Sequence, residues 1–112
     1  MKKIEAVIRP EKLDEVRQAL ENADCGGLMI SEIEGHGKQK GMVRQWRGEK
    51  YRLELLPKMK VDVVVNDKDV DSIVRIIVNA ARTGEVGDGK IFVSDVQDAI
   101  RIRTGEKGDM VL

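Results

Sequence analysis

Apolar residues alternate with polar ones in two short stretches, and apolar residues at helical spacing follow each stretch. Residues 4–8 and 61–65 are rich in β-branched side chains with period-two patterning, which predicts strands with one buried face. One apolar stripe runs along each predicted helix: Leu13, Val16, Leu20 and Ala23 in the first, and Val70, Ile73, Val74, Ile77 and Ala81 in the second. The pattern predicts a strand followed by a helix, twice.

The two halves of the chain resemble copies of one unit. A shift of 57 positions places residues 4–8 on residues 61–65 and aligns Asp14, Asn22 and Ala23 with Asp71, Asn79 and Ala80. A closing strand is expected in each unit, at residues 31–33 and 94–96, now at a shift of 63. The second unit therefore holds six extra residues, which fall in a glycine-rich stretch.

The predicted helices begin at residues that suit a first helical turn. Pro10 has a fixed φ that fits the first helical position. Asn66 and Asp67 are good N-cap residues and place negative charge at the positive end of the second helix dipole.

Two strand–helix–strand units in series predict one α+β domain over residues 1–112, a ferredoxin-like double βαβ sandwich of four antiparallel strands with two helices on one face. The uncovered face carries Val7 and Val64 beside Glu5 and Asp62. Because this face is too apolar to stay wet and too polar for a core, we expect it to pack against another copy of the chain.

The second and third strands enclose a long connection, residues 35–57, at the tip of their hairpin. It holds the only Trp, Tyr and His of the chain and has six basic residues against two acidic ones. Compact domains seldom keep connections longer than about 12–15 residues without a function, which favours a functional loop. The alternative is a surface insertion without a role.

Composition narrows the class of protein. The net charge of zero argues against a general nucleic-acid binder. The single Cys25 gives no sign of an oxidising compartment, and a small residue at a helix end is a simpler interpretation of it than a nucleophile. Neither a signal peptide nor an apolar run of about 18 residues is present, so we expect a soluble cytoplasmic protein.

Residues 84–90 satisfy the pattern G-x-x-x-x-G-K of a P-loop, but the next residue is Ile91 instead of Ser or Thr. The predicted order is also helix, loop, strand, the reverse of a P-loop. We therefore reject the P-loop. Residues 84–90 could still bind a phosphate, because glycines let backbone N–H groups approach an anion and Lys90 adds positive charge. The alternative is an ordinary glycine-rich turn.

A second basic element, the C-terminal loop 101–108, follows the last strand. Arg101 and Arg103 flank Ile102, so in extended chain both guanidinium groups would point the same way. Together with Lys90 they could clamp a polyphosphate. The alternative is a solvated strand end whose arginines pair with carboxylates.

The sequence offers no catalytic constellation, since His36 is the only histidine. An RNA-binding module of this fold would need stacking aromatics, and residues 4–8 and 61–65 hold none. A nucleotide hydrolase would need a group to position water beside Lys90, and none is evident. We expect at most a slow ATPase.

Residues 83–93, Thr-Gly-Glu-Val-Gly-Asp-Gly-Lys-Ile-Phe-Val, resemble the C-terminal signature of the PII nitrogen-regulatory signal proteins at every specified position. The resemblance extends over the whole chain through further motifs: Gly35-x-Gly37-x-Gln39-Lys40-Gly41, Arg47-Gly48-x-x-Tyr51, Leu56-Pro57-Lys58 and Arg101-Ile102-Arg103-Thr104-Gly105-Glu106. It implies a homotrimer that is not an enzyme. Pockets between subunits would bind ATP or ADP and, with Mg-ATP, 2-oxoglutarate. Loop 37–55 would act on a target, notably an ammonium transporter.

The same resemblance implies roles for individual residues. The residues for the phosphates and ribose of ATP or ADP would be Gly87, Asp88, Gly89, Lys90, Arg101 and Arg103. Those near the base would be Val7, Met29, Asp62 and Val64, and Lys38 would also bind the nucleotide. The residues for 2-oxoglutarate would be Gly37, Gln39, Lys40, Gly41, Lys58 and Gly87. Gln39 would also bind Mg²⁺, and Arg47 would contact the transporter.

The chain departs from the family pattern at several positions. Met29, Lys38 and Asp62 stand where the family usually has Thr, Arg and Glu. Tyr51 stands at the tyrosine that the family modifies by uridylylation, but three of the flanking positions in residues 46–50 differ from that signature. Tyr51 is therefore kept only as a candidate modification site.

Overall fold

The computed structural model describes residues 1–25, 27–40 and 51–112, with residues 36–40 and 51–55 described in backbone only. Along the chain the elements are β1 (Lys2–Ile8), η1 (Pro10–Lys12), α1 (Leu13–Asn22), β2 (Met29–Lys40), β3 (Tyr51–Val65), η2 (Asp67–Asp69), α2 (Val70–Ala81), β4 (Gly89–Asp95) and η3 (Asp109–Val111). Neither α1 nor α2, the α-helices of these described residues, is long and apolar enough to cross a bilayer.

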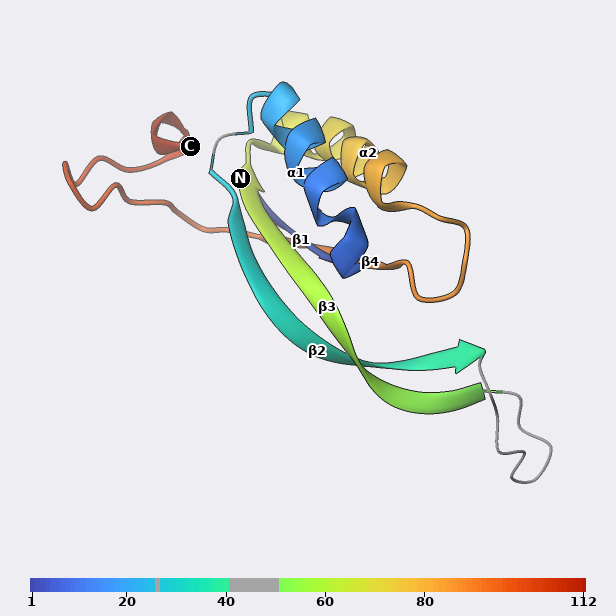
Figure 1. Ribbon diagram of the computed structural model, residues 1–112. Helices are drawn as coiled ribbons and strands as arrows, with labels where there is room; N and C mark the ends of the chain where they lie inside the picture. Colours follow the sequence, from blue (N-terminus) through green and yellow to red (C-terminus); the bar gives the residue numbers. More distant parts are fainter. Residues whose placement is uncertain (26, 41–50) are drawn as a thin grey trace.

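The strands form one antiparallel sheet in the order β2-β3-β1-β4, and both α-helices lie on one of its faces (Figure 1). The opening strands of the two repeated units lie side by side in the middle, with Ile4 opposite Val63. On its other side Ile4 pairs with Val93 of β4. The predicted ferredoxin-like double βαβ arrangement is confirmed.

The core lies between the helices and one face of the two central strands. Alternate residues of β1 and β3 point into it, as the period-two pattern predicts. The buried apolar residues are Ile4, Ala6, Ile8, Val16, Leu20, Val61, Val63, Val65, Ile73, Ile77 and Ala81. Both predicted helical stripes are confirmed, because their remaining members, Leu13, Ala23, Val70 and Val74, pack against this cluster partly buried.

Both helical segments begin with a short 3-10 turn. Pro10 opens the first, as predicted, and α1 follows from Leu13. Asn66 stands at the N-cap of the second, but its side chain donates or accepts no capping bond there. Among the described residues the Oδ1 atom of Asn66 is buried without a hydrogen-bond partner. The predicted start of the second helical segment is confirmed, without the capping bond.

The long connection differs from the sequence prediction. Strands β2 and β3 continue past Gly35 and Pro57 and stay paired as far as Lys40 and Tyr51, so residues 35–40 and 51–57 are arms of a hairpin. Glycine and proline are poor strand residues, which hid these arms. Pro57 is tolerated because β1 ends opposite Met59 and leaves β3 paired on one side only. Figure 1 shows the hairpin reaching beyond the helical layer.

The sheet face away from the helices is uncovered in a single chain. Its side chains include partly exposed Val7 and Val64, and Asp62, which is only 7% exposed. The Nζ atom of Lys60 lies 3.3 Å from a Glu5 carboxylate oxygen and 3.7 Å from one of Asp62. The face thus carries the apolar and acidic residues that the sequence predicts for it, and its packing against another copy stays a prediction.

Replacing a core residue should cost far more stability than replacing an exposed one of similar size. Leu20 is fully buried, so Leu20→Ala should lower the free energy of unfolding by about 2–5 kcal/mol. Ile102 is 99% exposed, so Ile102→Ala should change it by less than about 0.5 kcal/mol. Urea denaturation at one fixed protein concentration measures both. Equal losses would contradict the placement of Leu20 in the core.

Candidate functional site

The glycine loop, residues 82–90, joins α2 to β4 and contains three glycines with positive φ. These are Gly84 at 91°, Gly87 at 102° and Gly89 at 100°, values that residues with a side chain rarely adopt. At Gly89 an added Cβ would stand 1.7 Å from the carbonyl oxygen of Val7. Only glycine lets the loop enter β4 this close to β1.

Asp88 fastens the glycine loop to itself. Its Oδ2 accepts from the backbone N–H groups of Thr83 and Gly84, both at 2.9 Å. Its Oδ1 accepts from the Thr83 hydroxyl and, at 3.0 Å, from Nε of Arg9. These donors, the Thr83 hydroxyl first among them, hold the pKa of Asp88 far below its usual range. The ionised carboxylate therefore stabilises the fold above about pH 4, and this contribution is lost as the pH falls below that value.

Two cationic side chains lie under the glycine loop and donate to its carbonyl groups. Nη2 of Arg9 donates to Val86 O at 2.8 Å, and Nζ of Lys58 donates to Gly87 O at 2.6 Å. The pKa of Lys58 is lowered first by partial burial of its ammonium group and second by repulsion from the positive charge of Arg9. Arg9 balances the charge of Asp88, whereas Lys58 donates to a neutral carbonyl and leaves positive charge beneath the loop, which favours an anionic ligand.

Lys90 follows directly in β4, paired with Val7 of β1, and its side chain is exposed. A cleft of about 280 Å³ lies at this end of the sheet, between β4 and the last turns of α2. Its lining includes Val7, Val78, Asp88, Gly89 and Lys90. The structure therefore brings together four of the predicted phosphate-binding or base-binding residues at one end of β4.

The C-terminal loop is not extended, contrary to the sequence prediction. Residues 102–104 form a turn, closed by bonds from Gly105 N to Arg101 O at 2.7 Å and from Arg101 N to Glu106 O at 2.8 Å. Nη1 of Arg101 also lies 3.1 Å from Oε1 of Glu106, which is the pairing with a carboxylate that the alternative interpretation of this loop predicts. Arg103 is exposed. Gly105, with a positive φ, lets the chain fold back here. Side chains alternate between two faces only in an extended strand, so that rule does not predict where these arginines point.

The two basic elements lie at opposite ends of β4. Gly89 begins the strand and Asp95 ends it, a span of about 20 Å at the usual rise of a strand. Figure 1 shows the glycine loop and the C-terminal loop on opposite sides of the molecule. The prediction that Lys90, Arg101 and Arg103 clamp one polyphosphate is therefore wrong within a single chain.

The residues expected near a base divide in the same way. Met29 pairs with Asp62 in the β2–β3 ladder, and Val64 lies two residues further along β3. A hollow of about 550 Å³ opens beside Met29 and Val64. Within the described part of the chain, Oδ1 of Asp62 is buried and lacks a hydrogen-bond partner. Val7 instead lies opposite Lys90, at the glycine-loop end.

The remaining predicted residues lie on the hairpin. The backbone of Gly37, Lys38, Gln39 and Lys40 belongs to β2, and that of Tyr51 to β3. The side chains of these residues, and Gly41 and Arg47 altogether, lie outside the described residues. The described residues hold no group of three or more His, Cys, Asp or Glu side chains suited to a metal.

Sequence reasoning missed the contacts that Arg9 and Thr83 make with Asp88. The one feature of the sequence that could have indicated them is the aspartate itself. A carboxylate inside a phosphate-binding stretch would repel the ligand unless hydrogen-bond donors of the protein paired with it. Nothing in the spacing of the sequence joins Arg9 to a residue 79 positions away.

The two glycines with positive φ at the ends of the loop should respond differently to alanine. Nothing lies within 4 Å of an added Cβ at Gly84, so Gly84→Ala should lower the free energy of unfolding by about 1–3 kcal/mol through backbone strain alone. Gly89→Ala adds a backbone collision and should cost about 1–3 kcal/mol more. Urea denaturation of both variants checks the order; a smaller loss for Gly89→Ala would contradict the close approach to Val7.

Comparisons with known proteins agree over nearly the whole chain. The sequence model of the family described as Nitrogen regulatory protein P-II matches residues 1–106. Nitrogen regulatory protein P-II 2 of Methanothermobacter thermautotrophicus is 56% identical over 108 residues, which cover 96% of this chain and 94% of that protein. Nitrogen regulatory protein P-II of Nostoc punctiforme is 58% identical over 107 residues, 96% of each chain. The chain therefore belongs to the nitrogen regulatory protein P-II family, whose members are regulatory signal proteins and not enzymes.

Proposed function

We propose that this chain is a nitrogen-regulatory switch of the cytoplasm. It binds ATP or ADP and 2-oxoglutarate between the copies of a homotrimer, and it reports the bound ligand to an ammonium transporter through loop 37–55. The observation that carries this proposal is the division of the basic residues between the two ends of β4. Because the two halves lie apart within one chain, we infer that halves of neighbouring copies meet around one nucleotide.

The glycine-loop half has the properties of a phosphate cradle. Gly87 and Gly89 carry positive φ, which turns backbone N–H groups where a side chain would block an anion. Lys90 supplies an exposed ammonium group, and Lys58 adds positive charge beneath. Residues of these types fit the phosphates of ATP or ADP.

The other half suits a base and a sugar. The unpartnered Oδ1 of Asp62 calls for a hydrogen-bond donor, which the exocyclic amine of adenine supplies. Met29 and Val64 give apolar surface beside the hollow. Arg103 lies exposed in the C-terminal loop, free to reach the phosphates of a nucleotide that bridges two copies.

The uncovered sheet face supports association of copies. Val7 and Val64 remain partly exposed there, around the charges of Lys60, Glu5 and Asp62. Contact of such faces around a threefold axis would cover the apolar residues and keep each charge paired. A closed ring would also give every glycine loop a neighbouring C-terminal loop.

Mg²⁺ and 2-oxoglutarate complete the proposed effectors. Mg²⁺ is usually held by nucleotide phosphates and water with one or two protein ligands, so Gln39 alone would be sufficient. Lys58 is the candidate partner for a 2-oxoglutarate carboxylate, because its ammonium group already lies beside Gly87. Residues Gly37, Lys40 and Gly41 would close the same pocket from the hairpin.

The hairpin connects ligand and target. Its base, residues 37–41, would adopt one conformation with Mg-ATP and 2-oxoglutarate and another with ADP. A ligand shifts such an equilibrium only through its different affinity for the two states, typically about 1–3 kcal/mol. Arg47 would make the contact with the transporter, and Tyr51 stays a candidate modification site.

A site shared between copies can be tested by complementation. Lys90→Ala and Arg103→Ala should each weaken ATP binding at least tenfold, as expected for lost charged contacts of about 1.5–3 kcal/mol. When the two variants are refolded together, about one interface in four of a mixed ring combines an intact Lys90 with an intact Arg103. Calorimetry should then detect that fraction of sites with wild-type affinity.

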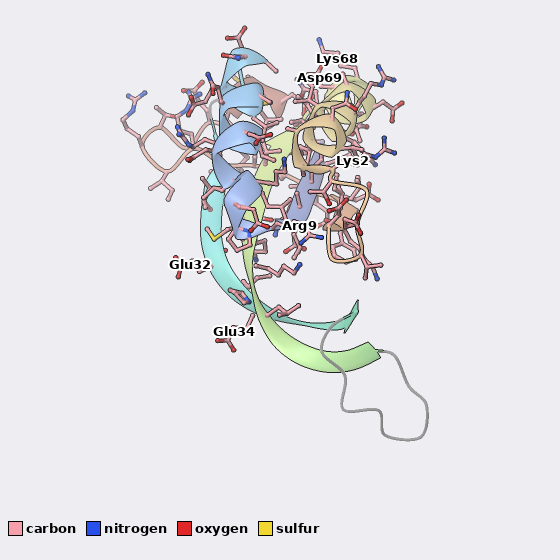
Figure 2. All side chains as sticks on the ribbon, turned by 45° about the vertical axis from the view of Figure 1, so that its right-hand side comes forward. Lys2, Arg9, Glu32, Glu34, Lys68 and Asp69 are labelled. Carbon is pink, nitrogen blue, oxygen red and sulfur yellow. The ribbon has the colours of Figure 1, made fainter. Side chains whose placement is uncertain are left out.

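The control for this experiment is Lys68→Ala, which removes an exposed lysine of η2, the 3-10 turn before α2, and should leave binding unchanged (Figure 2). If the mixture recovered no tight site, the nucleotide pocket would lie within one chain. If the wild-type chain bound neither ATP nor ADP, the proposed function itself would be rejected.

The proposed target can be tested by capture from cell membranes. An ammonium transporter should be recovered either with Mg-ATP plus 2-oxoglutarate or without them, but not in both conditions. Adding 2-oxoglutarate without Mg-ATP should act like no ligand at all. Arg47→Ala should abolish recovery, whereas Arg75→Ala, which removes an exposed arginine from α2, should not. Normal recovery with Arg47→Ala would show that the contact lies elsewhere.

A further inference from the structure

We propose that Arg9, Thr83 and Asp88 form a positioning network that holds the glycine loop in its anion-binding shape, and that none of their side chains contacts the nucleotide. This inference rests on the proposed function, because it assigns a role to residues around that same site. It changes the role of Asp88, which the family resemblance places among the nucleotide-binding residues.

The first observation is that both oxygens of Asp88 are already occupied. Oδ2 accepts two backbone N–H groups, and Oδ1 accepts the Thr83 hydroxyl and the Arg9 guanidinium. The side chain is one-quarter exposed. Contact of this carboxylate with a phosphate would break four hydrogen bonds and bring two negative charges together, so it is unfavourable.

The second observation is that these bonds close the loop into a ring. Asp88 reaches back five residues to Thr83 and four to Gly84. The Thr83 hydroxyl oxygen also accepts from Glu85 N at 3.1 Å. Because the loop has exposed residues and flexible glycines, such bonds rather than apolar packing must fix its shape.

The third observation is that Arg9 ties this ring to the sheet. It follows β1 directly, and Figure 2 shows it beside the glycine loop. Nε donates to Asp88 while Nη2 donates to Val86 O, and the side chain is only 18% exposed. An added Cβ at Gly87 would lie 3.3 Å from Nη2, so the guanidinium forms the floor of the loop.

Lys90 and Arg9 differ in whether their charged groups already have partners in the protein. Lys90 is exposed, and no hydrogen bond or ion pair of its side chain is found within the described part of the chain. Its ammonium group is therefore available to a ligand, while the charge of Arg9 is spent on Asp88 and on a carbonyl. One group acts on the nucleotide, and the other acts through the loop.

The test compares ATP affinity with the order of the loop in the full chain. Asp88→Asn keeps the shape and removes an acceptor, and Thr83→Val removes only the hydroxyl. Each should weaken ATP binding about tenfold in calorimetry, the usual size of a lost charged hydrogen bond. Without nucleotide, hydrogen exchange at the Thr83 and Gly84 amides should become faster by a similar factor in both variants.

Three comparisons separate positioning from direct contact. Thr83→Ser keeps the hydroxyl and should restore both the affinity and the slow exchange. Lys90→Ala should weaken ATP binding without changing exchange at Thr83 and Gly84. The double variant Thr83→Val with Asp88→Asn should lose less affinity than the product of the single losses, because the two residues act as one unit.

Two results would overturn the inference. Weaker ATP binding with unchanged exchange in Asp88→Asn would mean that the carboxylate touches the ligand directly. Faster exchange with wild-type affinity would mean that the ring is irrelevant to binding. If the wild-type chain bound no nucleotide, the proposed function would fail, and unchanged exchange in both variants would then reject the network by itself.

Discussion

The close approach of Gly89 to Val7 determines where the glycine loop ends and the sheet begins. An added Cβ at Gly89 would lie 1.7 Å from the Val7 carbonyl oxygen, so the loop can join β4 in this register only through glycine. That register sets Lys90 opposite Val7 and Phe92 opposite Glu5. The same register, continued through Lys2 opposite Asp95, decides which face of the sheet each β4 side chain occupies.

Most of the fold was predictable from the sequence, because its determinants are local. Period-two and helical patterns identified the central strands and both helices, and the repeat supplied their order. The hairpin arms were not predicted because Gly35, Gly37 and Pro57 are poor strand residues. These arms are strands because β2 and β3 pair with each other, which local sequence patterns do not show. The turn at residues 102–104 was missed because alternation predicts direction only while the chain stays extended.

The candidate site was predictable in its residue types but not in its arrangement. Glycines, Lys90 and two arginines indicated anion chemistry, yet their separation along β4 appears only in three dimensions. The bonds of Asp88 with Arg9 could not be inferred, since they join distant segments without a periodic signal. Sequence patterns thus identify the chemistry, and the pairing of strands decides which groups can meet on one ligand.

The length of β4 has a consequence for how chains of this family can vary. The strand is seven residues long, Gly89–Asp95; the glycine loop leads into its first end, and the chain continues from its other end to the C-terminal loop. One inserted residue would turn every following side chain to the opposite face of the sheet and lengthen the separation by about 3.3 Å. We therefore expect insertions to be excluded from β4, because the strand acts as a spacer of fixed length and parity.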